Sequence, residues 1–93
     1  MSDINKVLEE RGNRYGTFMG NAQLAQDLKN RVHDSRRWVF MKPDQQEAID
    51  NICQKIARLS NGDENYLDNW VDIIGYAQLV LDRLRQDENN KKT

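Results

Sequence analysis

The chain has 93 residues, of which 38% are hydrophobic and 31% are charged, and its net charge at pH 7 is -1. A chain of this length forms one domain with a single small core. No apolar run approaches the roughly 18 residues of a membrane span, and the N-terminus lacks the pattern of a secretory signal, so we expect a cytoplasmic protein. The single cysteine, Cys53, excludes an internal disulfide and a structural zinc site built on several thiolates.

The first predicted element is a short helix over residues 3–11. Ser2 or Asp3 can cap this helix, Gly12 can end it, and one apolar stripe follows from the spacing of Ile4, Val7 and Leu8. Turn residues between Gly12 and Gly16 separate it from a second helix over 17–33. The second helix is indicated by apolar residues at helical spacing: Phe18, Ala22, Ala25, Leu28 and Val32.

Residues 34–42 form a connector that is too apolar to remain in water, so we expect it to pack on the helices. Pro43 suits the first turn of a third helix, and Gly62 is the expected left-handed cap at its end. The core face of this third helix is predicted from Ile49, Ile52, Cys53, Ile56 and Leu59.

The last predicted helix covers about 65–86 and has a broad apolar stripe, which suggests contact with more than one neighbour. Residues 87–93 have nothing apolar to bury and are expected to form a disordered tail after a single helical domain over 1–86. The predicted fold is therefore all-α: a small bundle of three main helices plus a short N-terminal helix. Because the core is small, we expect homo-oligomerisation through residues 66–84 to complete the bundle.

Charge is segregated along the chain. The segment 29–42 carries five basic residues against Asp34, whereas 43–72 carries seven acids against two basic residues. One interpretation is that these are solvated helix faces. Another is that the acidic residues hold a divalent cation such as Mg²⁺ while basic and aromatic groups receive the phosphates and base of a nucleotide. A nucleic-acid surface is disfavoured because the chain has no basic excess.

The acids that could hold a cation form two helical pairs, one on each of the last two helices. The pairs are Glu47 with Asp50 and Asp68 with Asp72. If these helices fold back on each other around residues 61–65, Asp50 and Asp72 lie almost level, whereas Glu47 and Asp68 are separated by about 15 Å. Asp50 and Asp72 are therefore the better candidate ligands.

Several motifs together resemble a family of small phage and prophage proteins of unassigned function over residues 8–85. They are Tyr15-Gly16-x-Phe18-x-x-Asn21-Ala22, Ala48-x-Asp50-x-Ile52-x-x-Lys55-Ile56-Ala57-Arg58, Asn61-Gly62-Asp63 and Asp68-x-Trp70-x-Asp72-Ile73-x-Gly75-Tyr76-Ala77. More distantly, the paired carboxylates resemble the MazG-type all-α nucleoside triphosphate pyrophosphohydrolases, in which E-x-x-E and E-x-x-D helices hold Mg²⁺. This chain has E-x-x-D followed by D-x-x-x-D, so its second pair departs from that pattern.

The resemblance implies roles for individual residues. Asp50 and Asp72 would be the principal Mg²⁺ ligands, with Glu47 and Asp68 as further candidates. Lys55 and Arg58 would neutralise phosphate charge as catalytic residues. The nucleotide-binding residues would come from Tyr15, Asn21, Arg36, Arg37 and Trp38, with Tyr15 or Trp38 stacking on the base.

The remaining polar residues have simpler interpretations. Asn21 lies in an apolar stripe, so it either makes a structural hydrogen bond, for example to the Tyr15-Gly16 turn, or contacts a ligand. His33 is expected at the surface and Cys53 in the core. With one histidine and no phosphate-binding loop, the chain does not fit triad chemistry or a P-loop.

Two functions follow as expectations. The first is a phage-type nucleotide-binding protein, with Mg²⁺-dependent pyrophosphohydrolysis of a nucleoside triphosphate as its reaction. The alternative is a non-catalytic phage anti-defence protein that sequesters a nucleotide signal or binds a host defence protein. Either would act in the host cell cytoplasm, without a membrane partner.

Overall fold

The computed structural model describes residues 2–91, apart from the side chains of residues 2 and 11–13. It contains four α-helices, α1 (Ser2–Tyr15), α2 (Phe18–His33), α3 (Pro43–Asn61) and α4 (Leu67–Lys91), with a short 3-10 helix, η1 (Trp38–Phe40), between α2 and α3. The described residues contain no strand. The predicted all-α class, with three main helices and one N-terminal helix, is confirmed.

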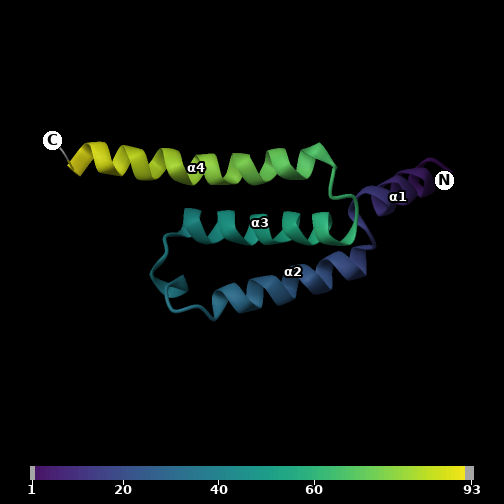
Figure 1. Cartoon of the computed structure of the whole chain (residues 1–93), viewed down its shortest axis with the longest axis horizontal. Helices are drawn as coiled ribbons and strands as arrows, with labels where there is room; N and C mark the ends of the chain where they lie inside the picture. The colour runs from purple at the N-terminus through teal and green to yellow at the C-terminus, as the bar shows by residue number, and fades with distance from the viewer. Residues whose placement is uncertain (1, 92–93) are drawn as a thin grey trace.

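The three main helices lie side by side in one layer. Neighbours along the chain run in opposite directions, and α3 lies in the middle, where it packs against both α2 and α4 (Figure 1). Helix α1 projects beyond one end of the layer and the C-terminal part of α4 projects beyond the other (Figure 1). The molecule is consequently elongated, with principal extents of 59 × 26 × 24 Å.

Small side chains hold this layer together. In the described part of the chain, the buried apolar residues are Ala25 of α2 and four residues of α3: Ala48, Cys53, Ala57 and Leu59. Ala57 is 0% exposed. Small residues at these positions let the helix axes approach closely, so α3 contacts a helix on each side. Cys53 is buried, as expected, and this burial raises the pKa of its thiol.

Helix starts follow the predicted chemistry more closely than helix ends. The Thr17 hydroxyl accepts a hydrogen bond from the Gly20 N–H at 3.1 Å, and Pro43 occupies the first turn of α3. Two predicted ends were wrong. Helix α1 continues through Gly12 to Tyr15, and Gly62 has a negative φ of -129° instead of a left-handed conformation.

The left-handed glycine is Gly16, with φ +84°, at the turn between α1 and α2. A Cβ at Gly16 would collide with the Asn61 backbone, and a Cβ at Gly62 would collide with the backbone of Arg14 and Tyr15. The α1–α2 turn and the end of α3 thus touch backbone to backbone, and the Asp63 N–H donates to the Arg14 carbonyl at 2.8 Å. Gly62 is required by close approach rather than by a left-handed cap.

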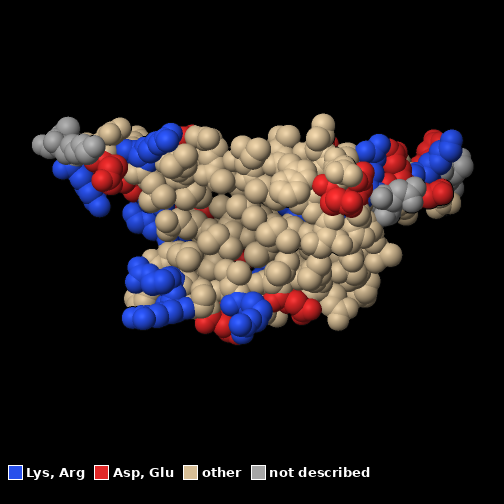
Figure 2. Space-filling view, in the orientation of Figure 1, with Lys and Arg blue, Asp and Glu red and all other residues tan. Residues whose placement is uncertain are grey.

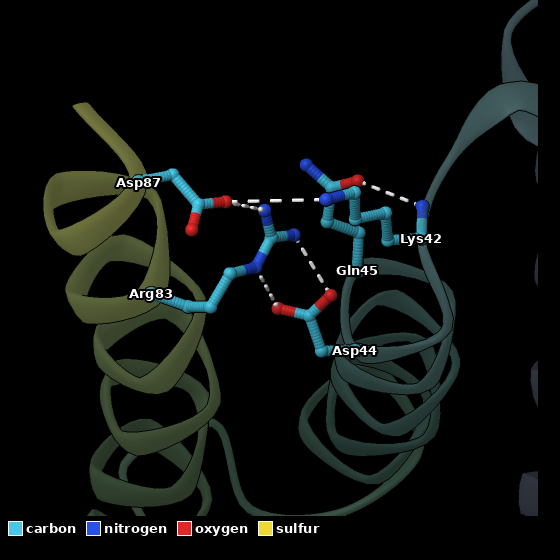
Figure 3. A network of polar contacts seen from close by, with 5 residues as sticks. All are labelled: Lys42, Asp44, Gln45, Arg83 and Asp87. Atoms are coloured by element: carbon cyan, nitrogen blue, oxygen red, sulfur yellow. Dashed lines mark hydrogen bonds and ion pairs between the residues drawn. The ribbon is translucent and has the colours of Figure 1, made fainter. Parts of the chain in front are cut away.

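The C-terminal end of the domain also differs from the prediction. Helix α4 continues through residues 87–91, which were expected to be part of a disordered tail; residues 92 and 93 lie outside the described chain. Side-chain contacts hold this part of the helix. The Arg83 guanidinium donates to both Asp44 oxygens, at 2.9 and 2.8 Å, and to Asp87 at 2.9 Å (Figure 3). Asp87 also lies 4.0 Å from the Lys42 ammonium (Figure 3).

Large apolar side chains remain at the surface of this layer. The α1 stripe of Ile4, Val7 and Leu8 is between 45% and 59% exposed. On α4, Leu67 is 74% and Ile74 66% exposed. The broad stripe predicted for the last helix is therefore present but largely uncovered in one copy of the chain.

Two glycines inside helices provide a matched stability test. A Cβ at Gly75 of α4 meets nothing within 4 Å among the described residues, whereas one at Gly20 of α2 collides with the Asn61 side chain. We expect Gly75→Ala to raise the free energy of unfolding by about 0.5–1 kcal/mol by reducing the entropy of the unfolded chain. Gly20→Ala should lower it. Chemical denaturation of both variants measures the two effects, and equal effects would contradict the packing described.

Arg83 should make the stability of the fold depend on pH in the acidic range. Its hydrogen bonds hold the pKa of Asp44 below the ordinary value of 3.8. The stability from Asp44 is therefore present above pH 3.8 and is lost as the pH falls through the lower folded-state value. We expect Arg83→Ala to lower the thermal midpoint at neutral pH and to flatten this acid dependence. Arg83→Lys, which keeps the charge but not the two parallel hydrogen bonds, should be intermediate. An unchanged acid profile in Arg83→Ala would contradict the assignment.

Candidate functional site

The four candidate metal ligands lie in separate surroundings. Asp50 faces α2, where its Oδ1 lies 2.6 Å from Nε2 of His33. Asp72 of α4 instead pairs with Lys55 of α3, with Nζ and Oδ2 3.0 Å apart. Positions 50 and 55 are about 140° apart around α3. The two acids therefore meet different partners, one toward each neighbouring helix.

The other two carboxylates are held locally. Glu47 Oε1 accepts a hydrogen bond from Asn51 Nδ2 at 3.1 Å, and Asp68 Oδ2 accepts one from the Tyr66 hydroxyl at 2.9 Å. Among the residues that the structure describes, no three His, Cys, Asp or Glu side chains are grouped so as to hold a metal ion. One chain thus does not fit the predicted magnesium centre, and we derive no metal-dependent step from it.

The predicted nucleotide-binding residues divide between the two ends of the layer. Tyr15 and Asn21 lie near the start of α2, whereas Arg36, Arg37 and Trp38 follow its end. Because a helix rises about 1.5 Å per residue, the 12 residues from Asn21 to His33 separate these groups by about 18 Å. The two sets cannot contact one small ligand within a single chain.

The far end of α2 is basic and aromatic. The Trp38 ring stacks on His33 with centroids 4.2 Å apart, and Gln46 Nε2 donates to the Trp38 carbonyl at 2.9 Å. Arg37 lies over the Phe40 ring at 5.0 Å, and Arg36 is exposed. The prediction that the connector over 34–42 packs on the helices holds for Trp38, but not for Val39 and Phe40, which are 76% and 68% exposed. One face of the Trp38 ring is therefore covered by His33.

A cluster of arginines and tyrosines lies beside the start of α2. We call it the Arg–Tyr cluster and define it as Arg14, Tyr15, Arg58 and Tyr66. The two tyrosine rings meet edge to face, with centroids 5.6 Å apart. Arg58 lies over the Tyr15 ring at 4.8 Å and Arg14 over the Tyr66 ring at 4.7 Å. Three segments contribute to it, because the turn contact at Gly16 and Gly62 brings α1, α3 and the α3–α4 loop together.

A hollow of about 300 Å³ adjoins this cluster. Its lining residues are Val7, Glu10, Arg14, Tyr15 and Tyr66. Arg14 Nε lies 3.4 Å from Glu10, and this pair is largely exposed to water. The hollow therefore offers aromatic edges, a guanidinium and one carboxylate to a ligand, and its volume is at the lower end of the range for small-molecule sites, about 300–1,000 Å³.

Two asparagines near the starts of α2 and α4 each bury one side-chain atom that lacks a hydrogen bond within the described chain. Asn21 Oδ1 and Asn69 Nδ2 are buried, and neither has a hydrogen bond to any described residue. The expected hydrogen bond from the Asn21 side chain to the Tyr15-Gly16 turn is thus not formed through its oxygen. Asn69, which is 1% exposed, was not singled out from the sequence because a polar residue next to Asp68 gives no signal of burial.

Sequence reasoning also missed Arg14, Tyr66 and His33 as members of these clusters. His33 remains 38% exposed, as the surface prediction required, but it packs on Trp38 and Asp50. Arg14 and Tyr66 are 52 positions apart, so only the tertiary contact of the two turns brings them together. The Asn61-Gly62 pair predicted a turn, but the sequence did not indicate that this turn packs against Arg14 and Tyr15.

Comparison with known proteins gives no match: no family model, no curated protein and no solved structure is similar to this chain. Across residues 2–91, none of the helices is both long and apolar enough to cross a membrane.

Tyr66 should titrate unusually. The hydrogen bond to Asp68 is the largest cause that raises the pKa of Tyr66 to about 12. A raised folded-state value means that the phenol contributes stability below pH 10, the ordinary value, which is lost as the pH rises toward 12. We expect Asp68→Asn to lower the Tyr66 pKa and reduce this alkaline loss. Ultraviolet titration, with Tyr66→Phe as the reference, isolates the signal. A Tyr66 that titrates alike with and without Asp68 would refute this coupling.

Proposed function

We propose that the chain is a phage-type nucleotide-binding protein that holds a nucleotide, or a nucleotide-derived signal of a host defence system, at the Arg–Tyr cluster without cleaving it. The observation that carries this proposal is the pairing of two guanidinium groups with two tyrosine rings beside a hollow of about 300 Å³. Arginine can form paired hydrogen bonds with phosphate oxygens, and tyrosine can stack on a base.

The cluster supports binding because its groups are already ordered. Each guanidinium rests on a ring at less than 5 Å from the ring centroid, so a ligand need not immobilise a free arginine side chain. The resemblance implied that Tyr15 binds the nucleotide and that Arg58 neutralises phosphate charge. Tyr15 and Arg58 lie next to each other and to Arg14 and Tyr66, so one cluster contains all the proposed binding residues.

Hydrolysis is not part of the proposed function because the carboxylates are held apart by different partners. A Mg²⁺-dependent pyrophosphohydrolase needs several carboxylates around the phosphates. Here Asp50 pairs with His33, Asp72 pairs with Lys55, and Asp68 accepts from Tyr66. Lys55 is engaged at Asp72, which removes it from the phosphate-binding role expected for it. The function therefore proposed is sequestration rather than turnover.

The test is a binding measurement with a panel of mono-, di-, tri- and cyclic nucleotides by calorimetry, with and without a metal chelator. We expect binding that survives chelation, with the nucleotide recovered intact by chromatography. Arg58→Ala should weaken binding at least tenfold, because a charge-assisted hydrogen bond contributes about 1.5–3 kcal/mol. The matched control is Arg85→Ala, an exposed arginine of α4 outside the cluster.

Three results would contradict the proposal. Release of pyrophosphate from a triphosphate with Mg²⁺ would restore the enzymatic reading. Equal weakening by Arg58→Ala and Arg85→Ala would indicate nonspecific attraction of anions. Absence of binding to every nucleotide class would leave a host defence protein as the partner.

A further inference from the structure

The central helix, α3, has two chemically different sides. On α3, Ile49, Ile52 and Ile56 recur at spacings of three and four and so share one side of the helix. Glu47 and Arg58, about 160–180° from Ile49 around the helix, lie on the opposite side. Ile56 remains 39% exposed although it lies on the central helix of the layer.

Helix α4 continues the apolar side of α3. Trp70, Ile74, Leu81 and Leu84 also recur at spacings of three, four and seven, and they are 50%, 66%, 40% and 41% exposed. A groove of about 360 Å³ runs between the two helices. It is lined by Met41, Gln45, Ala48, Ile49, Ile52, Ala77, Val80, Leu81 and Leu84. The groove and the exposed side chains together form one surface.

We call this surface the apolar face and define it as Ile49, Ile52 and Ile56 of α3 with Trp70, Ile74, Leu81 and Leu84 of α4. Figure 2 shows a side of the molecule whose centre, over α3 and the adjoining part of α4, has few charged side chains. Lysine, arginine, aspartate and glutamate gather toward its ends and lower edge (Figure 2). An uncharged centre with a charged rim is the composition of a protein–protein interface.

The ion pairs between helices lie away from the apolar face. Asp72, which pairs with Lys55, is about 200° from Trp70 around α4, and Asp44, which pairs with Arg83, is about 140° from Ile49 around α3. The apolar face is therefore free of these charges, and a second surface of the same kind could approach it without leaving an ion unpaired.

The buried core of one chain contains few of its large apolar side chains. Among the described residues, Leu59 is the only large apolar side chain in the buried set; the others are alanines and a cysteine. Stable domains are built from at least two packed layers around their large apolar side chains. Here the three main helices supply one layer, and large apolar side chains such as Trp70 and Ile74 of α4 remain exposed.

We propose that the apolar face binds the apolar face of a second copy of this chain, forming a symmetric dimer of two helical layers. A second copy is present whenever the chain is made, whereas a different partner is not, and the missing layer is needed for stability from the start. A two-fold pair uses the same surface on each copy, which an uncharged face permits because no like charges oppose each other.

The area is adequate for such a pair. At roughly 60–100 Å² of apolar surface for each of the seven side chains, the apolar face supplies about 400–700 Å² on each copy. Together with the area of the surrounding rim, this apolar area approaches the roughly 800 Å² that each partner buries in a standard interface. The hydrophobic core between the two copies would then be larger than the core inside each copy.

The experiment measures mass in solution by light scattering and sedimentation on the full chain. We expect a species of twice 10.9 kDa for the unchanged protein. Ile74→Asp places a charge in the apolar face and should convert the protein to single chains. Met19→Asp is the matched control, since Met19 of α2 is 72% exposed and lies outside the apolar face, and this variant should keep the dimer mass.

If Ile74→Asp fails to fold, the unchanged protein still decides the matter. A dimer that unfolds to two chains has a denaturation midpoint that rises with protein concentration, and we expect such a rise. A mass of 10.9 kDa with a midpoint that does not depend on concentration would overturn the proposal. So would a dimer that Ile74→Asp leaves intact, because the contact would then use another surface. Nucleotide binding is measured separately, so failure of either proposal is distinguishable from failure of the other.

Discussion

The close packing of α3 between α2 and α4 is the constraint on which the rest of the structure depends. Ala48, Cys53 and Ala57 are small enough for α3 to be approached from two sides at once. Helix α3 then separates α2 from α4, and several large apolar residues of α4 remain exposed. The elongated shape, the exposed side of α4 and the proposed dimer all follow from this arrangement.

The same layer fixes the ends of the molecule. At one end, two glycine turns press against each other, and this contact assembles the Arg–Tyr cluster from segments far apart in the sequence. At the other end, Arg83 joins the start of α3 to the last turns of α4 (Figure 3). The first contact creates a hollow with aromatic and cationic groups, whereas the second is a structural tie. Their different chemistry is the reason for placing the proposed function at the first.

Electrostatics also explains why the acidic residues do not form one centre. A carboxylate on a helix flank pairs with the nearest basic or hydrogen-bonding side chain of the neighbouring helix, and α3 has neighbours on both sides. Asp50 therefore meets His33 on α2, while Asp72 meets Lys55 from the other side of α3. Each pairing uses a carboxylate that the sequence pattern had assigned to a shared ion. Sequence spacing carries no information about which side chain of a neighbouring helix faces each acid.

The sequence alone determined the helices. Apolar spacing predicted the all-α class, Pro43 predicted the start of α3, and the apolar stripe of α3 predicted a buried Cys53, because these features depend on local backbone geometry and side-chain size. Tertiary structure decided the rest. Gly12 did not end α1, Gly62 took its conformation from the backbone of Arg14 and Tyr15, and Asp87 extended α4 through Arg83. Such outcomes depend on contacts between distant segments, whose free energy exceeds the small local preferences that the sequence reveals.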